Sequence, residues 1–303
     1  MQNIILVAGA TGNLGGRIVQ SLLEKGAVVR VVVRSQSDPE KIAHLEQLGA
    51  EIFKIEHWTL ESLTPACKEV ACVVSALAGL RAVILDAQKT LLDAALAAGV
   101  PRFIPSDYSL DFTRFTDGEN RNLDLRREFH TYLDQKPISA TSIFNGAFMD
   151  MIVDQMPFLL LKQKMVLYWG NPDHPWGFTT VDNTANYTAH VALDPSTPRY
   201  LRIAGDLISP KRAKTVVDQV THQKFRLFRP GGQGFLGVMI KIIRRLAPGS
   251  NELYPAWQGM QYMHNMIDDR SNIDHLDNDR YPAMRWTTVQ EFLEGYWAAK
   301  GGE

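Results

Sequence analysis

The feature that most constrains this chain is a glycine-rich turn near its N-terminus. Three glycines, Gly9, Gly12 and Gly15, recur at every third position. An apolar run at residues 3–7 precedes them, and residues 13–25 place their apolar side chains at helical spacing. A strand, a tight turn and a helix in this order, with this glycine spacing, are typical of dinucleotide-binding folds.

Each glycine has its own physical role in such a turn. Gly9 permits the tight turn, Gly12 lets the backbone approach a pyrophosphate, and Gly15 lets the helix pack closely on the strand. The helix N-terminus offers free N–H groups and the positive end of the helix dipole to the phosphates. A glycine-rich turn without a ligand is the alternative. We expect these residues to contact a dinucleotide: Gly9, Thr11, Gly12, Asn13, Leu14 and Gly15.

The end of the second expected strand indicates which dinucleotide binds. An Asp or Glu at this point would hold the ribose 2′-hydroxyl of NAD. This chain has Arg34 and Ser35 there instead, about twenty residues beyond the glycines. Arginine presents a planar, permanently charged group to a 2′-phosphate. We therefore expect NADP(H), although a solvated surface arginine would look the same in sequence.

Strand and helix patterns alternate through the first half of the chain. Valine-rich or apolar runs are followed by helical periodicity, and this alternation predicts an α/β fold with a doubly wound parallel sheet of the Rossmann type. The expected strands are residues 3–7, 28–33, 51–55, 70–75, 102–105 and 139–144. We assign residues 1–155 to an NADP(H)-binding Rossmann domain.

The pattern loosens after about residue 150. We expect residues 156–303 to form a smaller substrate lobe, partly interleaved with the first domain. Residues 230–285 are rich in Met, Tyr, Trp and Arg and carry few regular signals. They are either ordinary aromatic core or a lid over the carboxyl ends of the strands. The side chains that would form a pocket there are Tyr254, Trp257, Met260, Tyr262 and Met263.

Composition excludes several classes of partner. The formal net charge is -1, so we expect neither nucleic acid nor an acidic membrane surface as a partner. Arg244 and Arg245 indicate a solvated helix face. Cys67 and Cys72 fall in apolar segments, which predicts core thiols and a reducing compartment. The eight histidines show no metal-ligand spacing, and no apolar run is long enough to span a bilayer. We expect a cytoplasmic monomer or homodimer without a metal.

Several segments together resemble one family. The similarity is to segments of the NmrA-like and isoflavone-reductase-like group of atypical short-chain dehydrogenases, and it is carried by residues 9–15 and 31–34, residues 102–108 (Arg-Phe-Ile-Pro-Ser-Asp-Tyr), and residues 141–148, 181–185 and 205–209. The resemblance covers most of residues 1–225. It implies an NADP(H)-binding Rossmann domain with a smaller C-terminal substrate lobe. It also implies one of two functions, because some members reduce small aromatic molecules with NADPH and others sense dinucleotides without turnover.

The chain departs from this family in its catalytic helix. Reductases of the isoflavone type carry a lysine there, but this chain has no lysine between Lys89 and Lys136. Two Tyr-x-x-x-Lys matches occur, and neither is at an expected catalytic position: Tyr132…Lys136 lies away from the cofactor edge, and Tyr296…Lys300 lies in the last helix. The lack of a properly placed Tyr-x-x-x-Lys also argues against a sugar-nucleotide epimerase. We expect an NADPH-dependent reductase of a small aromatic or conjugated carbonyl compound. The alternative is an NADP(H)-sensing regulator without turnover.

If the chain is an enzyme, another group must supply the proton. Tyr108 follows the fifth strand and is a candidate acid, and Arg126 is a candidate fixed positive charge. Tyr108 as a packing aromatic over the nicotinamide is the alternative. Further expected cofactor contacts follow the fourth, fifth and sixth strands: Ser75, Ala76, Leu77, Pro105, Ser106, Asn145 and Phe148.

Overall fold

The computed structural model describes residues 4–153, 156 and 158–300. It divides into two compact units, each built from three stretches of the chain. Unit 1 comprises Met1–Tyr108, Leu125–Ile143 and Thr184–Leu201, and unit 2 comprises Ser109–Asp124, Phe144–Asn183 and Arg202–Glu303. The functional assignment of residues 1–155 to the cofactor and 156–303 to the substrate stays a prediction.

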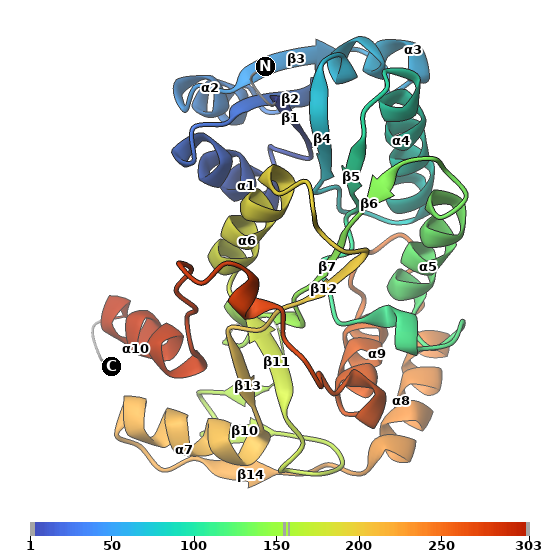
Figure 1. Cartoon of the computed structure of the whole chain (residues 1–303). Coiled ribbons are helices and arrows are strands. Elements are labelled where there is room, and N and C mark those ends of the chain that lie inside the picture. Colours follow the sequence, from blue (N-terminus) through green and yellow to red (C-terminus); the bar gives the residue numbers. More distant parts are fainter. Residues whose placement is uncertain (1–3, 154–155, 157, 301–303) are drawn as a thin grey trace. The chain divides into compact units, whose positions relative to one another are not determined.

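A six-stranded parallel sheet organises unit 1, with strand order β3-β2-β1-β4-β5-β6. This order is that of a Rossmann fold, and helices cover both faces of the sheet (Figure 1). The predicted fold class is therefore confirmed. The strands are β1 (Ile4–Ala8), β2 (Val28–Arg34), β3 (Glu51–Ile55), β4 (Val70–Ser75), β5 (Arg102–Ile104) and β6 (Ser139–Ala140).

Sequence chemistry explains the crossover helices of this sheet. Helix α1 (Asn13–Glu24) buries Ile18, Val19 and Leu22 on one face, as the apolar spacing predicts. Asp38 caps the next helix by accepting a hydrogen bond from the amide of Glu40 at 3.0 Å. The other helices between these strands are α2 (Pro39–Gln47), α3 (Leu60–Leu63), a π-helical turn (Ala82–Ala87) continuing into α4 (Gln88–Ala97), and α5 (Arg121–Leu133). Helix α6 (Val181–Leu193) comes later in the chain, after the last strand of this sheet.

Valine-rich strands and the helices form a continuous apolar core in unit 1. Phe103 of β5 and Phe129 of α5 are fully buried, with ring centroids 6.2 Å apart. Cys67 and Cys72 are free thiols in this unit, and burial raises the pKa of each to about 12. Both are therefore inert core residues, in agreement with the prediction.

Short strands and helices build unit 2. The predicted strand at 139–144 is divided between β6 and β7 (Ser142–Phe144), and β7 pairs with β12 (Tyr200–Arg202) where the chain changes unit. One three-stranded sheet contains β8 (Ala147–Phe148), β11 (Trp176–Thr179) and β13 (Asp206–Ile208), and another contains β9 (Leu159–Leu160), β10 (Met165–Leu167) and β14 (Arg226–Phe228).

The helices of unit 2 include two in a stretch where the sequence indicated only a helix face at Arg244 and Arg245. Ser209 caps α7 (Pro210–Thr221) by accepting a hydrogen bond from the amide of Arg212 at 3.3 Å. Residues 230–285, expected to be mostly irregular, contain α8 (Gln233–Leu246) and α9 (Ala256–Met266). The last helix is α10 (Val289–Ala299). Among the described residues, no helix combines the length and the apolar character needed to cross a membrane.

Candidate cofactor and active site

The glycine turn of unit 1 leaves no space for side chains at two positions. A Cβ on Gly9, whose φ is +85°, would lie 2.5 Å from the carbonyl oxygen of Ala76, and a Cβ on Gly15 would lie 2.2 Å from that of Gly9. A Cβ on Gly12 would meet only the Gly9 oxygen, at 3.2 Å. Gly9 and Gly15 are therefore required by packing, while Gly12 faces open space on its other side.

The N-terminus of α1 is chemically suited to an anion. Gly12 is its N-cap, and no side chain of the described residues caps the helix. No acidic side chain lies in its first turn. Amide groups at such an end need an acceptor. The turn and helix start thus form a cradle that fits a pyrophosphate, which would satisfy these amides.

Arg34 ends β2 and is exposed. It forms no ion pair with the acids that the structure describes, so its guanidinium is available to a ligand. The neighbouring Ser35 is held to β3, because its amide and its hydroxyl both donate to the carbonyl of Ile55, at 2.8 and 3.2 Å. This placement fits a ribose 2′-phosphate at the end of β2.

The carboxyl ends of β1, β4 and β5 bring several predicted residues together. The amide of Ala76 donates to the carbonyl of Ala8 at 2.8 Å, and the hydroxyl of Ser106 donates to that of Leu77 at 2.7 Å. The Ser106 amide donates to Oε1 of Gln88, at 2.9 Å. Pro105 precedes Ser106 in this segment and is buried. Gln88 is fully buried in α4, and no sequence pattern pointed to it.

Ser75 is a buried polar residue at the same edge of the sheet. Its side chain is fully buried at the end of β4. Its hydroxyl has no hydrogen-bond partner among the described residues. A buried hydroxyl without a partner costs free energy, so a ligand at this edge would gain by pairing with it.

A buried charge network beside this edge was not predicted. Asp107 is fully buried, and its Oδ2 lies 2.6 Å from Nε2 of His130. The hydroxyl of Ser142 donates to the same oxygen at 2.6 Å, and Nη1 of Arg199 donates to the Ser142 hydroxyl at 2.6 Å. These residues come from distant parts of the sequence. Only the tertiary fold brings them together.

The electrostatics of the network favour an ionised Asp107. Burial by itself would raise the pKa of this carboxyl group. This effect is opposed by the charge of His130, by hydrogen bonds from His130 and Ser142, and by the charge of Arg126. Together they hold the pKa of Asp107 below its usual value. Ser142 is fully buried and donates to the carboxylate, so this is not a serine nucleophile activated by a base.

Tyr108 and Arg126, the candidate catalytic residues, both belong to unit 1. Burial raises the pKa of Tyr108, and the neighbouring Thr188 side chain lowers it by a smaller amount. The phenol therefore stays protonated at neutral pH. Nε of Arg126 donates to the carbonyl of Ser106 at 3.1 Å. The arginine therefore holds the backbone two residues before Tyr108. A protonated phenol and a fixed guanidinium are suited to donating a proton and stabilising an oxyanion.

Asn145 and Phe148 fall in unit 2. Asn145 is fully buried, and neither side-chain polar atom has a partner among the described residues. Its backbone carbonyl accepts from the hydroxyl of Thr179 at 2.6 Å, which fixes the segment before β8. Phe148 ends β8 and is half-buried. Asn145 therefore presents an unpaired side-chain amide at a position predicted to contact the cofactor.

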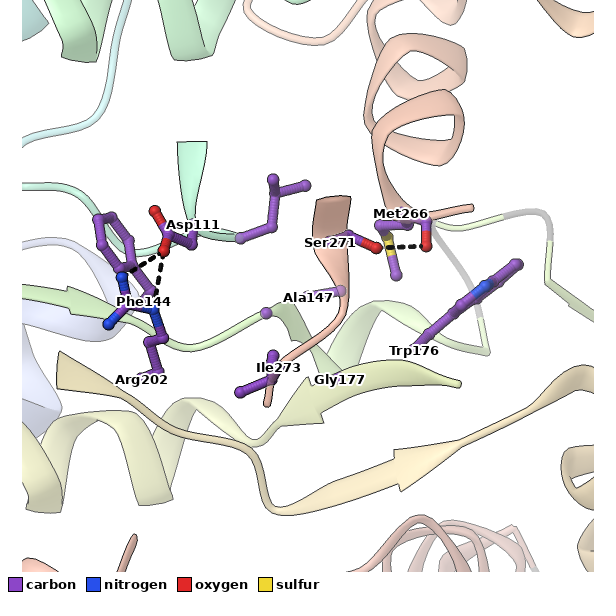
Figure 2. A pocket seen from close by; sticks show the side chains of 11 residues that line it. Asp111, Phe144, Ala147, Trp176, Gly177, Arg202, Met266, Ser271 and Ile273 are labelled. Atoms are coloured by element: carbon purple, nitrogen blue, oxygen red, sulfur yellow. Dashed lines mark hydrogen bonds and ion pairs between the residues drawn. The ribbon is translucent and has the colours of Figure 1, made fainter. Parts of the chain in front are cut away.

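A small cavity lies within unit 2 (Figure 2). Its volume is about 30 Å³, room for one or two waters, whereas pockets for aromatic ligands enclose several hundred. Asp111 and Arg202 form an ion pair at its edge, with Arg202 Nε 2.8 Å from Asp111 Oδ2. The lining residues are Leu110, Asp111, Phe144, Gly146, Ala147, Trp176, Gly177, Arg202, Met266, Ser271 and Ile273. In this conformation the cavity is too small for an aromatic substrate.

The aromatic residues predicted to form a pocket do not line this cavity. Trp257 and Met263 are buried in α9, and Tyr254 is exposed. The Trp257 ring packs against the guanidinium groups of Arg121 and Arg244, at 4.8 and 4.9 Å from its centroid. Met266 and Trp176 line this cavity.

Comparison with known proteins identifies the family. Residues 1–293 match the model of the NmrA-like family. The chain belongs to the NmrA-like family. This NmrA-like chain is similar to pinoresinol reductase 2 of Arabidopsis thaliana, with 26% identity and 96% of each chain covered. The family resemblance predicted from the sequence segments is thereby confirmed.

Solved structures show the same fold. The complex of AtPrR2 with NADP+ and (+)pinoresinol has a TM-score of 0.84 at 24% identity, covering 98% of this chain and 99% of the other. An isoflavone reductase has a TM-score of 0.80 at 18% identity, covering 98% and 100%. The likeness extends over both units, so it includes the C-terminal residues that the sequence resemblance left out.

The Asp107 network predicts a specific pH dependence of stability. A lowered folded-state pKa contributes stability above the unfolded value, about 4, which is lost as the pH falls through the folded value. Asp107→Asn removes the charge and leaves His130 without its anion, at a cost of about 3 kcal/mol. We expect the variant's Tm to lie below wild type at pH 7, with the gap narrowing below about pH 4.

The measurement is thermal unfolding from pH 3 to 7, with Asp86→Asn as the control. Asp86 is exposed, so the Tm of Asp86→Asn should nearly equal that of wild type at every pH. A gap between wild type and Asp107→Asn that stays constant over the whole pH range would contradict the assignment of an ionised Asp107.

Proposed function

We propose that this protein is an NADPH-dependent reductase that acts on a small aromatic or conjugated carbonyl compound. The observation that carries the proposal is the phosphate cradle of unit 1 followed by Arg34, in a chain of the NmrA-like family. Its relative named pinoresinol reductase supports an aromatic substrate. The missing lysine favours the alternative, an NADP(H)-sensing protein without turnover.

The residues of unit 1 divide the cofactor between them. The backbone from Gly9 to Gly15 would hold the pyrophosphate, Arg34 and Ser35 the 2′-phosphate, and Ser75 a polar group deeper at the sheet edge. In unit 2, Asn145 stays a proposed cofactor contact, because its buried side-chain amide has no hydrogen-bond partner among the described residues. Bound NADPH supplies a hydride.

Reduction of a carbonyl group leaves an alkoxide that must be stabilised and protonated. Tyr108 keeps its proton at neutral pH and is the proposed acid. Arg126 is the proposed positive charge, and its bond to the Ser106 carbonyl fixes it in place. The buried Asp107 network positions the segment that carries Ser106 and Tyr108.

We further propose a cytoplasmic location, because two free, buried thiols suit a reducing compartment. Both a monomer and a homodimer are compatible with the proposed chemistry.

The cofactor preference is testable at Arg34. We expect wild type to bind NADPH more tightly than NADH, and Arg34→Ala to weaken NADPH binding on the order of ten- to hundredfold, because a charge-assisted hydrogen bond is lost. NADH affinity should change little. Calorimetry with both cofactors measures this, and Lys41→Ala, an exposed cation on α2, is the control. Equal affinities in wild type, or an unchanged preference in Arg34→Ala, would refute the proposal.

Turnover is tested by NADPH oxidation across quinones, aldehydes, enones and pinoresinol. We expect at least one compound to be reduced, with loss of absorbance at the nicotinamide band and a reduced product found by mass spectrometry. If every compound stays unreacted while NADPH binds tightly, the alternative of a sensor without turnover replaces the enzyme.

With a substrate in hand, Tyr108→Phe tests the proton donor. We expect turnover to fall on the order of 10²-fold, because the variant lacks a positioned acid, while NADPH affinity stays nearly unchanged. A matched control is Tyr132→Phe, whose phenol bonds Asp93 at 2.7 Å on α4, away from the glycine turn. Full turnover in Tyr108→Phe would make this residue a packing aromatic and solvent the proton source.

A further inference from the structure

Helix α8 carries an exposed apolar stripe separate from its core-facing side. Phe235, Val238, Ile242 and Leu246 follow one another at spacings of three and four residues, which places them on one face of the helix. Their exposed fractions are 54, 52, 52 and 79%. The buried residues of α8, Leu236 and Ile240, lie on another face. The stripe therefore lies largely outside the hydrophobic core of unit 2, although the Phe235 ring also packs near a buried ring, that of Trp169, with centroids 6.1 Å apart.

The apolar stripe lies in the most basic stretch of the chain. Residues 219–251 contain six basic side chains and no Asp or Glu, although the whole chain has 33 acids against 32 bases. Three of the six, Lys241, Arg244 and Arg245, are on α8 and are exposed. A local positive charge of this size in an otherwise neutral protein attracts an anionic partner.

The charge pattern argues against a second copy of this chain. A two-fold interface through the stripe would bring the same six bases from each chain and no acid from residues 219–251 of either. The apolar groups would pair, but the charges would not be complemented. An anionic partner complements both properties of this surface.

We propose that the α8 surface, defined by Phe235, Val238, Ile242 and Leu246 with Lys241 and Arg245, docks on an anionic lipid surface. A helix with an apolar stripe and Lys or Arg on its polar side lies in the membrane interface, with its apolar side chains in the acyl boundary and its bases on the headgroups. The 14 residues of α8 extend about 21 Å, which suits a helix lying along the surface rather than crossing it. The proposal departs from the expectation, from net charge alone, that no membrane is a partner.

The two halves of the surface have separable effects. The apolar side chains supply a hydrophobic contribution that does not depend on lipid charge. Each base near an anionic surface adds a contribution that salt weakens. A helix docked in this way should therefore require anionic lipid and should be released as the ionic strength rises.

The test is sedimentation of the full chain with vesicles of phosphatidylcholine alone or of phosphatidylcholine with about 30% phosphatidylserine. The anionic vesicles carry the negative surface potential that attracts Lys and Arg side chains. We expect binding to the anionic vesicles only. Lys241→Gln/Arg245→Gln should lower the partition coefficient on the order of tenfold or more. Ile242→Ser/Leu246→Ser should lower it by a similar factor, because two apolar side chains no longer insert.

Matched controls isolate the surface from general charge and apolarity. Lys41→Gln/Lys54→Gln removes two exposed bases of unit 1, and Leu60→Ser removes an exposed apolar side chain on α3. Both should bind vesicles as wild type does. Thermal unfolding and NADPH affinity of all variants should match wild type, which shows that the fold is intact.

Three outcomes would overturn the proposal. One is the absence of binding to anionic vesicles, and another is equal binding to neutral vesicles. The third is a dimer, seen by light scattering, that Ile242→Ser/Leu246→Ser dissociates while vesicle binding is absent, which would assign the surface to a second copy.

Discussion

The close approach of α1 to the end of β1 is the constraint on which unit 1 depends. Gly15 packs against the Gly9 carbonyl at a distance that no Cβ could share, and Gly9 itself turns the chain against Ala76. These contacts direct the start of α1 toward the carboxyl edge of the sheet. The uncapped amides, Ser75 and the Ser106 segment consequently face the same edge. Any larger residue at Gly15 would separate the helix from the strand and disperse this set.

The Asp107 network holds the other side of that edge. An ionised carboxylate without a solvent shell is stable only when charges and donors surround it, and here His130 and Ser142 provide both. Arg199 extends the network to Asp134 on the surface. Because Asp107 lies between Ser106 and Tyr108, the network fixes the backbone that carries the proposed acid. A family member that lacks the usual lysine still has a rigid, charged support there.

Local patterns were sufficient for most of unit 1 and insufficient for unit 2. The alternation of valine-rich runs and helical spacing predicted the parallel sheet, because each strand and each crossover helix is formed by residues that are contiguous in the sequence. In residues 230–285 the sequence indicated only a helix face at Arg244 and Arg245, and packing within unit 2 decides where α8 and α9 form. Trp257 and Met263 are buried in α9, where Trp257 packs against Arg121 and Arg244, and the pocket expected around them stays a prediction.

The sequence by itself determined the glycine turn, the Arg34 position and the order of strands and helices. These are properties of residues close in the chain, where turn geometry and periodicity act directly. The tertiary structure alone decided which distant polar groups meet, as in Asp107, His130 and Ser142, and which apolar side chains of α8 remain uncovered. Burial and pairing depend on contacts between remote segments, and no local pattern records them. Arg244 and Arg245 look in sequence like an ordinary solvated face, and only the exposure of Ile242 and Leu246 beside them shows an amphipathic surface.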